Sequence, residues 1–367
     1  MSGLAVSGLS ARFGRNEVLR GVDLAVAPGE TLVLFGPSGA GKTVLLRAIA
    51  GLEPGATGVI HIDGRDVSGL GPEARSLGMA FQNFALYPHM TARENIASPL
   101  RARGLAPAES ERRVGAVAAL LRIDHVLSHP PRALSNGQKQ RTALARALVG
   151  KPRVLLLDDP LRNVDAKLRY EMRLELPRLL RQSAAATIYV TQDYREAMAL
   201  GDRVAVLLGG AIVQCAPPEL IYDQPRSVAV ARLFGDPPMN LLPCRPHADP
   251  AGLRVDVAGL QLALDAAAAA AGKPCLLGLR PETLTLAAEG RAGAAAEVIA
   301  ATPLHERMVV LLRGAAGEEI VASVAGGMAL APGQTVAFRA ESGQALLFDA
   351  ESGERIPPRR AVAEKAA

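Results

Sequence analysis

Residues 31–43 read TLVLFGPSGAGKT, and this stretch decides the fold. The apolar run from Thr31 to Phe35 predicts a buried β-strand, and a helical pattern follows from Lys42 to Ala50. A glycine-rich loop between a strand and a helix can fold tightly and direct backbone N–H groups at an anion. The helix N-terminus adds partial positive charge. The stretch therefore predicts a phosphate-binding loop, in preference to an ordinary glycine-rich turn.

The end of this loop predicts how a nucleoside triphosphate is held. We expect Lys42 to reach the β- and γ-phosphates and Thr43 to bind Mg²⁺. The remaining candidate nucleotide-binding residues of the loop are Gly36, Pro37, Ser38, Gly39, Ala40 and Gly41.

Composition limits the class of protein. The chain has 367 residues, 49% apolar and 21% charged, which predicts a globular protein of two domains. The net charge of +5 is mild, and the sequence contains no basic block. No nucleic-acid partner is therefore expected. The three cysteines are isolated, which fits a reducing cytoplasm. No signal peptide or membrane-spanning run is recognisable, so we expect any membrane role to depend on partner proteins.

Strand and helix patterns alternate as far as Gly235, which predicts an α/β domain over residues 1–235. Its middle, residues 91–150, is more helical: Thr91 begins a capping-box pattern, and Pro107 is suited to open a second helix. The predicted strands are Thr31–Phe35, Val59–Ile62, Leu77–Phe81, Arg153–Asp158 and Thr187–Thr191, with a hairpin of Arg203–Leu208 and Ala211–Cys215.

The pattern changes at Gly235-Asp236-Pro237-Pro238, which marks a domain boundary. The short alternating runs beyond it predict a small all-β domain over residues 236–356, with a flexible tail at 357–367. These runs are Leu253–Leu264, Cys275–Leu279, Glu297–Ala301, Met308–Leu312, Thr335–Phe338 and Leu346–Phe348.

Three further motifs are each weak alone. Gln82 follows a predicted strand, where a glutamine is commonly only a polar loop residue. Ser135 and Gln138 have the spacing of a helix capping box. Asp158 ends an apolar strand, and in a buried parallel sheet this places its carboxylate at the nucleotide edge, suited to Mg²⁺.

Together these motifs occur in one order, and the first domain resembles the ATP-binding cassette (ABC) ATPases. The resemblance implies that Phe13 stacks on adenine, that residues 36–43 form the Walker A loop and that Gln82 is the Q-loop residue. It implies that Mg²⁺ is held by Thr43, Gln82 and Asp158. The signature motif matches Leu134–Gln138, and the D-loop matches Asn163-Val164-Asp165.

Within the family the chain is similar to the carbohydrate-importer branch, including the maltose and glycerol-3-phosphate importer ATPases. Residues 81–91, 238–243 and 278–282 carry this similarity. It implies an OB-like regulatory second domain, two integral-membrane permease subunits and a periplasmic or surface solute-binding protein. It also implies a peripheral location at the cytoplasmic face of the inner membrane, with a sugar or polyol as the solute.

The sequence departs from the family at two catalytic positions. Asp159 stands where Glu is usual, and Gln192 stands where His is usual. The shorter carboxylate is retracted from the attacking water, and displacements of ~1 Å can cost on the order of 10²-fold in rate. An amide can donate a hydrogen bond to a phosphate but cannot carry charge. We therefore expect weakened hydrolysis; the alternative is tolerated variation in a working homodimer.

ABC ATPases act as head-to-tail dimers in which the signature of one chain binds the other chain's ATP. Here that motif is Ser135, Asn136, Gly137 and Gln138, with Asn136 in place of a usual glycine. The partner is expected to be a second, distinct ATPase chain or a second copy of this chain. Other readings remain: a nucleotide-gated regulatory subunit with little turnover, a soluble ATPase acting on nucleic acid, or an importer ATPase for another solute.

Overall fold

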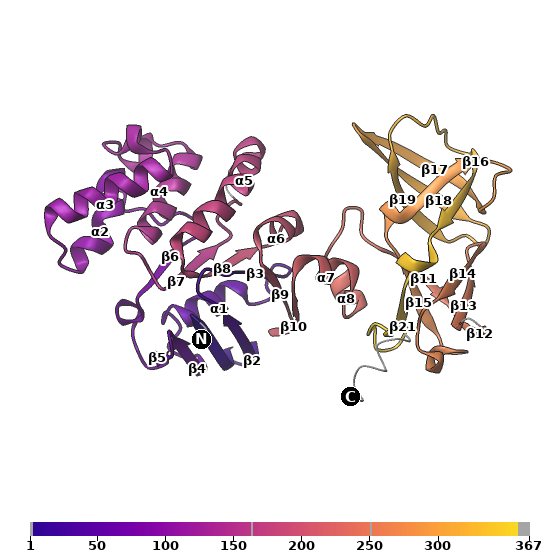
Figure 1. Ribbon diagram of the computed structural model, residues 1–367, viewed down its shortest axis with the longest axis horizontal. Helices are drawn as coiled ribbons and strands as arrows, with labels where there is room; N and C mark the ends of the chain where they lie inside the picture. The colour runs from indigo at the N-terminus through magenta and orange to yellow at the C-terminus, as the bar shows by residue number, and fades with distance from the viewer. Residues whose placement is uncertain (1–2, 163, 250–251, 359–367) are drawn as a thin grey trace. The chain divides into compact units, whose positions relative to one another are not determined.

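The computed structural model describes residues 3–162, 164–249 and 252–358 and divides the chain into two units, Met1–Ile221 and Tyr222–Ala367. Asn163 of the expected D-loop and residues 359–367 of the expected tail lie outside the described residues. Within the first unit, a mostly parallel sheet is flanked by helices, and the second unit is built largely of strands (Figure 1). The predicted combination of an α/β unit and a β-rich unit is confirmed.

The central sheet of the first unit has the order β10-β9-β3-β8-β7-β6. Strands β3, β7 and β8 are buried along their whole length, which explains their continuous apolar sequences. All neighbours are parallel except β9 and β10, which form the predicted hairpin. The bounds are β3 Thr31–Phe35, β6 Leu77–Ala80, β7 Val154–Asp158, β8 Ala186–Thr191, β9 Arg203–Leu208 and β10 Ala211–Ala216.

Helix α1 (Lys42–Ile49) follows β3 directly, as predicted, and its far end is fixed by a buried arginine. Arg75, only 4% exposed, donates hydrogen bonds to the carbonyl oxygens of Ala48 and Ile49 at 2.9 and 2.8 Å. The same guanidinium donates to the carbonyls of Leu70 and Ser68. A cation at the negative end of a helix is favourable, so Arg75 stabilises the last turn of α1.

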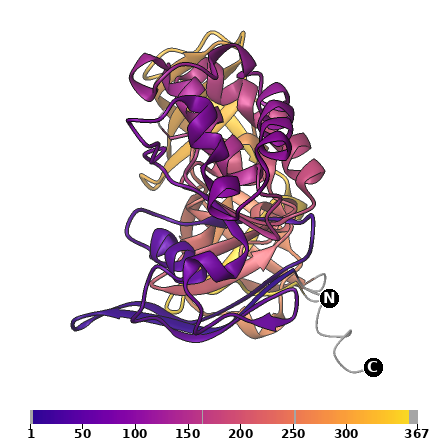
Figure 2. The same cartoon turned by 90° about the vertical axis from the view of Figure 1, so that its left-hand side faces the viewer.

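The first unit has a second sheet, of order β2-β1-β4-β5. Of its four strands, only β4 was predicted from the sequence. Its long antiparallel hairpin, β1 and β2, extends as an indigo ribbon from the body of the first unit (Figure 2). Phe13 pairs with Asn16 at the tip of this hairpin and is 49% exposed. The bounds are β1 Leu4–Phe13, β2 Asn16–Val26, β4 Thr57–Ile62 and β5 Arg65–Asp66.

The predicted helical segment contains α2 (Ala92–Ala102), α3 (Pro107–Leu120) and α4 (Asn136–Leu148). The capping box of Thr91 and Glu94 is present at the start of α2, and Pro107 opens α3. Further helices of the chain are α5 Ala166–Ser183, α6 Tyr194–Leu200, α7 Pro218–Asp223 and α8 Val228–Ala231.

The second unit contains sheets of order β11-β15-β21, β12-β13-β14 and β16-β20-β17-β18-β19, and most of its buried apolar side chains form a shared core. The predicted run Leu253–Leu264 is two strands, not one. Ala258 and Gly259 separate them with φ of +53° and +78°, as a tight hairpin turn requires. The strand bounds are β11 Asn240–Cys244, β12 His247–Asp249, β13 Gly252–Val257, β14 Leu260–Leu264, β15 Cys275–Leu279, β16 Leu284–Ala288, β17 Ala294–Leu304, β18 Arg307–Gly314, β19 Glu319–Ala325, β20 Thr335–Ala340 and β21 Leu346–Asp349.

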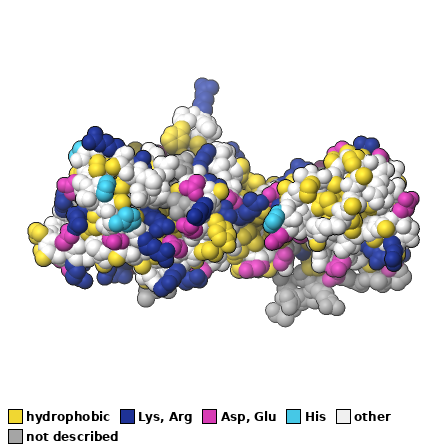
Figure 3. Space-filling view, turned by 90° about the horizontal axis from the view of Figure 1, so that it is seen from above, with side chains coloured by type: hydrophobic (Ala, Val, Ile, Leu, Met, Phe, Trp, Pro, Cys, Tyr) yellow, Lys and Arg dark blue, Asp and Glu magenta, His cyan; other side chains and the backbone are white. Residues whose placement is uncertain are grey.

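Two surface properties bear on partners. Over the part of the chain that the structure describes, no helix is both long enough and apolar enough to cross a membrane. On the face shown in Figure 3, Lys and Arg side chains are interspersed with Asp and Glu.

Candidate functional site

The carboxyl ends of β3, β7 and β8 meet beside the start of α1, and a cleft of about 300 Å³ lies there. This is where open parallel sheets bind ligands, because the loops that leave neighbouring strands diverge. The residues that line the cleft are Val18, Ser38, Gly39, Gly41, Lys42, Thr43, Val44, Gln82, Asp158, Asp159, Arg162, Val190 and Gln192.

The loop before α1 has the backbone shape that its glycines predict. A Cβ at Gly36 would lie 2.4 Å from the carbonyl oxygen of Leu207, so no larger residue fits without movement. Gly41, the N-cap of α1, has φ of +103°, a conformation that side chains disfavour. The glycines therefore bring the backbone close to β9 and turn it into the helix N-terminus.

Lys42 is 6% exposed, and its Nζ donates to the carbonyl oxygens of Gly36 and Pro37 at 2.7 and 2.8 Å. Burial lowers the pKa of Lys42, while the carboxylates of Asp159 and Asp158 act against that shift. The ammonium thus lies among the residues that line the cleft. In the structure it contacts its own loop, and a bound phosphate would have to compete with these two carbonyls.

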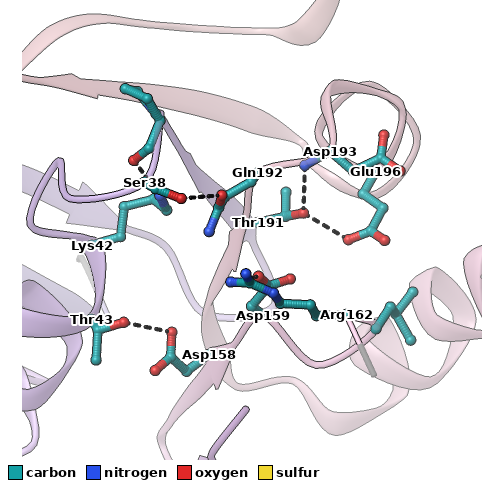
Figure 4. Close-up of polar contacts among 12 residues, drawn as sticks. Ser38, Lys42, Thr43, Asp158, Asp159, Arg162, Thr191, Gln192, Asp193 and Glu196 are labelled. Atoms are coloured by element: carbon teal, nitrogen blue, oxygen red, sulfur yellow. Dashed lines mark hydrogen bonds and ion pairs between the residues drawn. The ribbon is translucent and has the colours of Figure 1, made fainter. Parts of the chain in front are cut away.

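Thr43 Oγ1 donates to Asp158 Oδ1 at 3.1 Å, which joins the start of α1 to the end of β7 (Figure 4). A hydroxyl and a carboxylate this close are both hard oxygen donors of the kind that Mg²⁺ takes. Burial raises the pKa of Asp158, and the hydrogen bond from Thr43 partly offsets it. Gln82 also lines this cleft, so the three residues expected to hold Mg²⁺ are brought together and their chemistry fits the ion.

Asp159 is 8% exposed and has φ of +46°, in the left-handed region. Its backbone N–H donates to the carbonyl of Val190 at 3.0 Å, which fixes this turn to the end of β8. Burial raises the pKa of Asp159, and the guanidinium of Arg162, whose Nη1 lies 3.7 Å from Asp159 Oδ2, opposes that shift. The carboxylate therefore lies in the cleft and is paired with an arginine.

Gln192 reaches the phosphate-binding loop from the opposite side. Its Oε1 accepts a hydrogen bond from Ser38 Oγ at 2.8 Å (Figure 4). This contact links the loop after β3 to the loop after β8. The structure therefore places both altered positions, Asp159 and Gln192, on the wall of the cleft opposite Lys42 and Thr43.

A buried carboxylate supports the loop that carries Gln192. Glu196, in α6 and 2% exposed, accepts hydrogen bonds from Thr191 Oγ1 at 2.8 Å and Tyr189 Oη at 2.9 Å. Burial raises the pKa of Glu196. Thr191 Oγ1 also accepts a hydrogen bond from the backbone N–H of Asp193, the N-cap of α6. The side chain of Asp193 in turn accepts a hydrogen bond from Arg173 Nη2 at 2.7 Å.

Other predicted site residues lie outside the residues that line the cleft. Phe13 is at the hairpin tip, Asp165 follows the turn after β7, and Gly36, Pro37 and Ala40 form the loop without lining the cleft. Ser135 caps α4, and both halves of a capping box with Gln138 are present, so the predicted capping box is confirmed. The role of this motif in binding a partner's ATP stays a prediction. Ser135 and Asn136 are exposed, Gly137 is buried and Gln138 is half-buried.

Sequence reasoning missed four residues of the cleft: Val18, Val44, Arg162 and Val190. Val18 comes from β2, a strand that was not predicted. The position of Arg162, three residues after Asp159, was the one sequence feature that could have pointed to the cleft. The side-chain direction of a turn residue, however, cannot be predicted from spacing.

Comparisons with known proteins agree with this architecture. Residues 19–162 match the family model of the ABC transporter, residues 235–284 that of the MalK OB fold domain and residues 277–348 that of the TOBE domain. Among solved structures, the chain resembles the dimeric ATP-binding cassette MJ0796 in a post-hydrolysis state bound to ADP and Pi. The TM-score is 0.53 with 27% identity, over 59% of this chain and 98% of that one.

Curated relatives match over most of their length. An sn-glycerol-3-phosphate import ATP-binding protein UgpC from Chromobacterium violaceum is 44% identical over 93% of each chain. The protein of the same name from Cereibacter sphaeroides is 46% identical over 77% of this chain and 79% of its own. The chain therefore belongs to the ABC transporter family, as an ATPase of the kind that couples ATP hydrolysis to import.

Proposed function

We propose that this chain is the energy-coupling ATPase of an importer for a sugar or polyol, and that sn-glycerol-3-phosphate is the solute to test first. The names of the relatives support this solute class. The observation that carries the ATPase role is the convergence of Lys42, Thr43 and Asp158 on one cleft at the ends of parallel strands.

In this proposal the helix N-terminus and loop N–H groups bind the phosphates of ATP, and Lys42 exchanges its two carbonyl contacts for phosphate oxygens. Thr43, Asp158 and Gln82 hold Mg²⁺, which would neutralise charge on the phosphates. Phe13 stacks on the adenine, and residues Ser135–Gln138 bind the ATP of a partner chain. Asp165 belongs to the loop that faces that partner.

The partners of the proposed complex are two permease subunits, a second ATPase chain and a solute-binding protein, at the cytoplasmic face of the membrane. The segment after Gln82 is suited to transmit movement to a permease, because it is held firmly. Arg146 of α4 donates to the carbonyls of Phe84 and Ala85, and buried Asn95 donates to those of Tyr87, Met90 and Thr91.

The two altered residues lead to a finer proposal, that this chain's own site hydrolyses ATP slowly and that its natural partner is a distinct ATPase with a complete site. Asp159 is short by one methylene, and Gln192 is neutral and engaged with Ser38. The same observation favours a second candidate, a nucleotide-gated regulatory subunit. Single-turnover hydrolysis of the isolated chain separates the two, since a regulatory subunit would leave bound ATP intact.

Solute uptake tests the main proposal. The chain is co-expressed with the partners of the proposed complex, in cells that lack other glycerol-3-phosphate and maltose uptake. We expect labelled sn-glycerol-3-phosphate to accumulate with the wild-type chain and not with Lys42→Ala. Uptake that is equal in the Lys42→Ala variant would refute the coupling role, and Lys42-dependent uptake of maltose alone would correct the solute.

A further inference from the structure

Arg162 is a positively charged residue of the cleft, and none of the sequence motifs described above includes it. It lines the cleft together with Lys42, Thr43 and Gln192, and its side chain is 50% exposed. Figure 4 shows its guanidinium beside Asp159, on the side of the cleft that carries Gln192. Its position is therefore that of a second positive charge opposite Lys42.

The backbone that carries Arg162 is held in place. Its N–H donates to the carbonyl of Asp159 at 3.3 Å. Arg169, from α5, donates to the carbonyls of Leu161, Arg162 and Val164 at 3.3, 3.4 and 3.0 Å. A long side chain on a fixed turn can move its charged end while its base stays in register with the cleft.

The present contact of Arg162 leaves room for an anion. Its guanidinium lies near Asp159, with Nη1 at 3.7 Å from Oδ2. A guanidinium has five N–H donors, and its planar fork matches phosphate oxygens. Phosphate is a strong acceptor, so a bound triphosphate can compete with Asp159 for this guanidinium.

The charges of the cleft point to the same role. Among the lining residues that the structure describes, Lys42 and Arg162 are the cations, and Asp158 and Asp159 are the carboxylates. Gln192, at the end of β8, brings an uncharged amide. A magnesium nucleoside triphosphate is still anionic and needs positive charge around it. On the wall that carries Gln192, Arg162 is the lining residue that supplies such charge.

We infer that Arg162 is a phosphate-binding residue that contacts the terminal phosphate of ATP and supplies the charge that Gln192 lacks. The inference rests on the proposed ATPase function and deepens it. The proposal places Arg162 against the terminal phosphate, so the contact is expected to favour a triphosphate over a diphosphate.

The test compares the affinity of the full-length chain for a non-hydrolysable ATP analogue and for ADP, both with Mg²⁺, by calorimetry. Arg162→Gln is expected to weaken analogue binding about 10-fold, as the loss of one charge-assisted hydrogen bond predicts, and ADP binding less than about 2-fold. Arg162→Lys, which keeps the charge without the fork, is expected to fall between.

Arg153→Gln is the matched control. Arg153 also pairs with an aspartate, Asp63, at 3.3 Å, but it precedes β7, at the strand end away from the cleft. This variant should bind both nucleotides as the wild type does. Thermal unfolding verifies that each variant is folded; if Arg162→Gln is not, Arg162→Lys decides with an expected loss of about 3-fold for the analogue alone.

Two results would overturn the inference: analogue binding within about 2-fold of wild type in the Arg162 variants, or equal weakening of ADP binding. A different result would contradict the proposed function. That function requires Lys42→Ala to lose binding of both the ATP analogue and ADP. A chain in which Lys42→Ala abolishes binding and Arg162→Gln changes nothing remains an ATPase without this contact.

Discussion

The two walls of the nucleotide cleft are built in different ways. The loop wall, residues 36–43 with Asp158, is shaped by glycine conformations, backbone carbonyls and one hydroxyl–carboxylate contact. The switch wall, Asp159, Arg162 and Gln192, depends on side-chain contacts, an ion pair and an amide held by Ser38. Because backbone geometry survives many substitutions and side-chain chemistry does not, the two walls can change independently in this chain.

Removal of the loop wall's charge should have the largest effect. We expect Lys42→Ala to weaken ATP binding about 100-fold, because a buried ammonium and its charge-assisted hydrogen bonds to phosphate are lost. Calorimetry with ATP measures this, with exposed Lys273→Ala as the control. Unchanged affinity in Lys42→Ala would mean that the loop wall does not hold the phosphates as proposed.

Restoration of the switch wall should raise turnover without a change in binding. We expect Asp159→Glu with Gln192→His to increase steady-state ATPase activity at least about 10-fold, and each single change to do much less, because the two groups act on one transition state. The measurement uses saturating ATP for wild type, both single variants and the double variant. If wild type already turns over at roughly 1–10³ s⁻¹ and the double variant is no faster, the weakened-site proposal is wrong.

Replacement of Glu196, the buried carboxylate behind the switch wall, should have the smallest effect. We expect it to change how the stability of the protein depends on pH. The native pKa of Glu196 is raised above its ordinary 4.5, so the folded state holds this proton more tightly and loses stability as pH rises from about 4.5 through the native pKa. Glu196→Gln should lack this decrease. Thermal unfolding over about pH 4 to 8 measures it.

Glu94 is the matched opposite. Hydrogen bonds from Thr91 lower its pKa, so its contribution is present above about pH 4.5 and is lost as pH falls through the native pKa. Glu94→Gln should therefore remove a stabilisation at neutral pH that wild type loses in acid. Parallel pH profiles for the two variants would contradict the assignment of opposite shifts.

The sequence predicted the elements whose pattern is local and continuous. The buried strands β3, β7 and β8, the helix after the loop and the capping box at Thr91 were all found from apolar runs and turn chemistry. Strands β1 and β2 were missed because both are only half-buried and carry register shifts that interrupt alternation.

The cleft was predicted less completely than the strands, for a physical reason. Lys42, Thr43 and Asp158 lie at fixed offsets from strand ends, so spacing places them. Arg162 enters the cleft through a turn that depends on the left-handed φ of Asp159 and on carbonyl contacts from Arg169, which is on a helix further along the chain. Such tertiary positioning leaves no periodic signal.

The four carbonyl contacts of Arg75 have a consequence for the motion that accompanies nucleotide binding. They hold the far end of α1 to residues 68–70, so α1 cannot slide along its axis or tilt at that end without breaking buried, charge-assisted hydrogen bonds. We therefore expect the loop before α1 to be the more stationary side of the cleft. If the loops after β7 and β8 adjust to nucleotide instead, amide hydrogen exchange should slow there far more than in α1 when nucleotide binds.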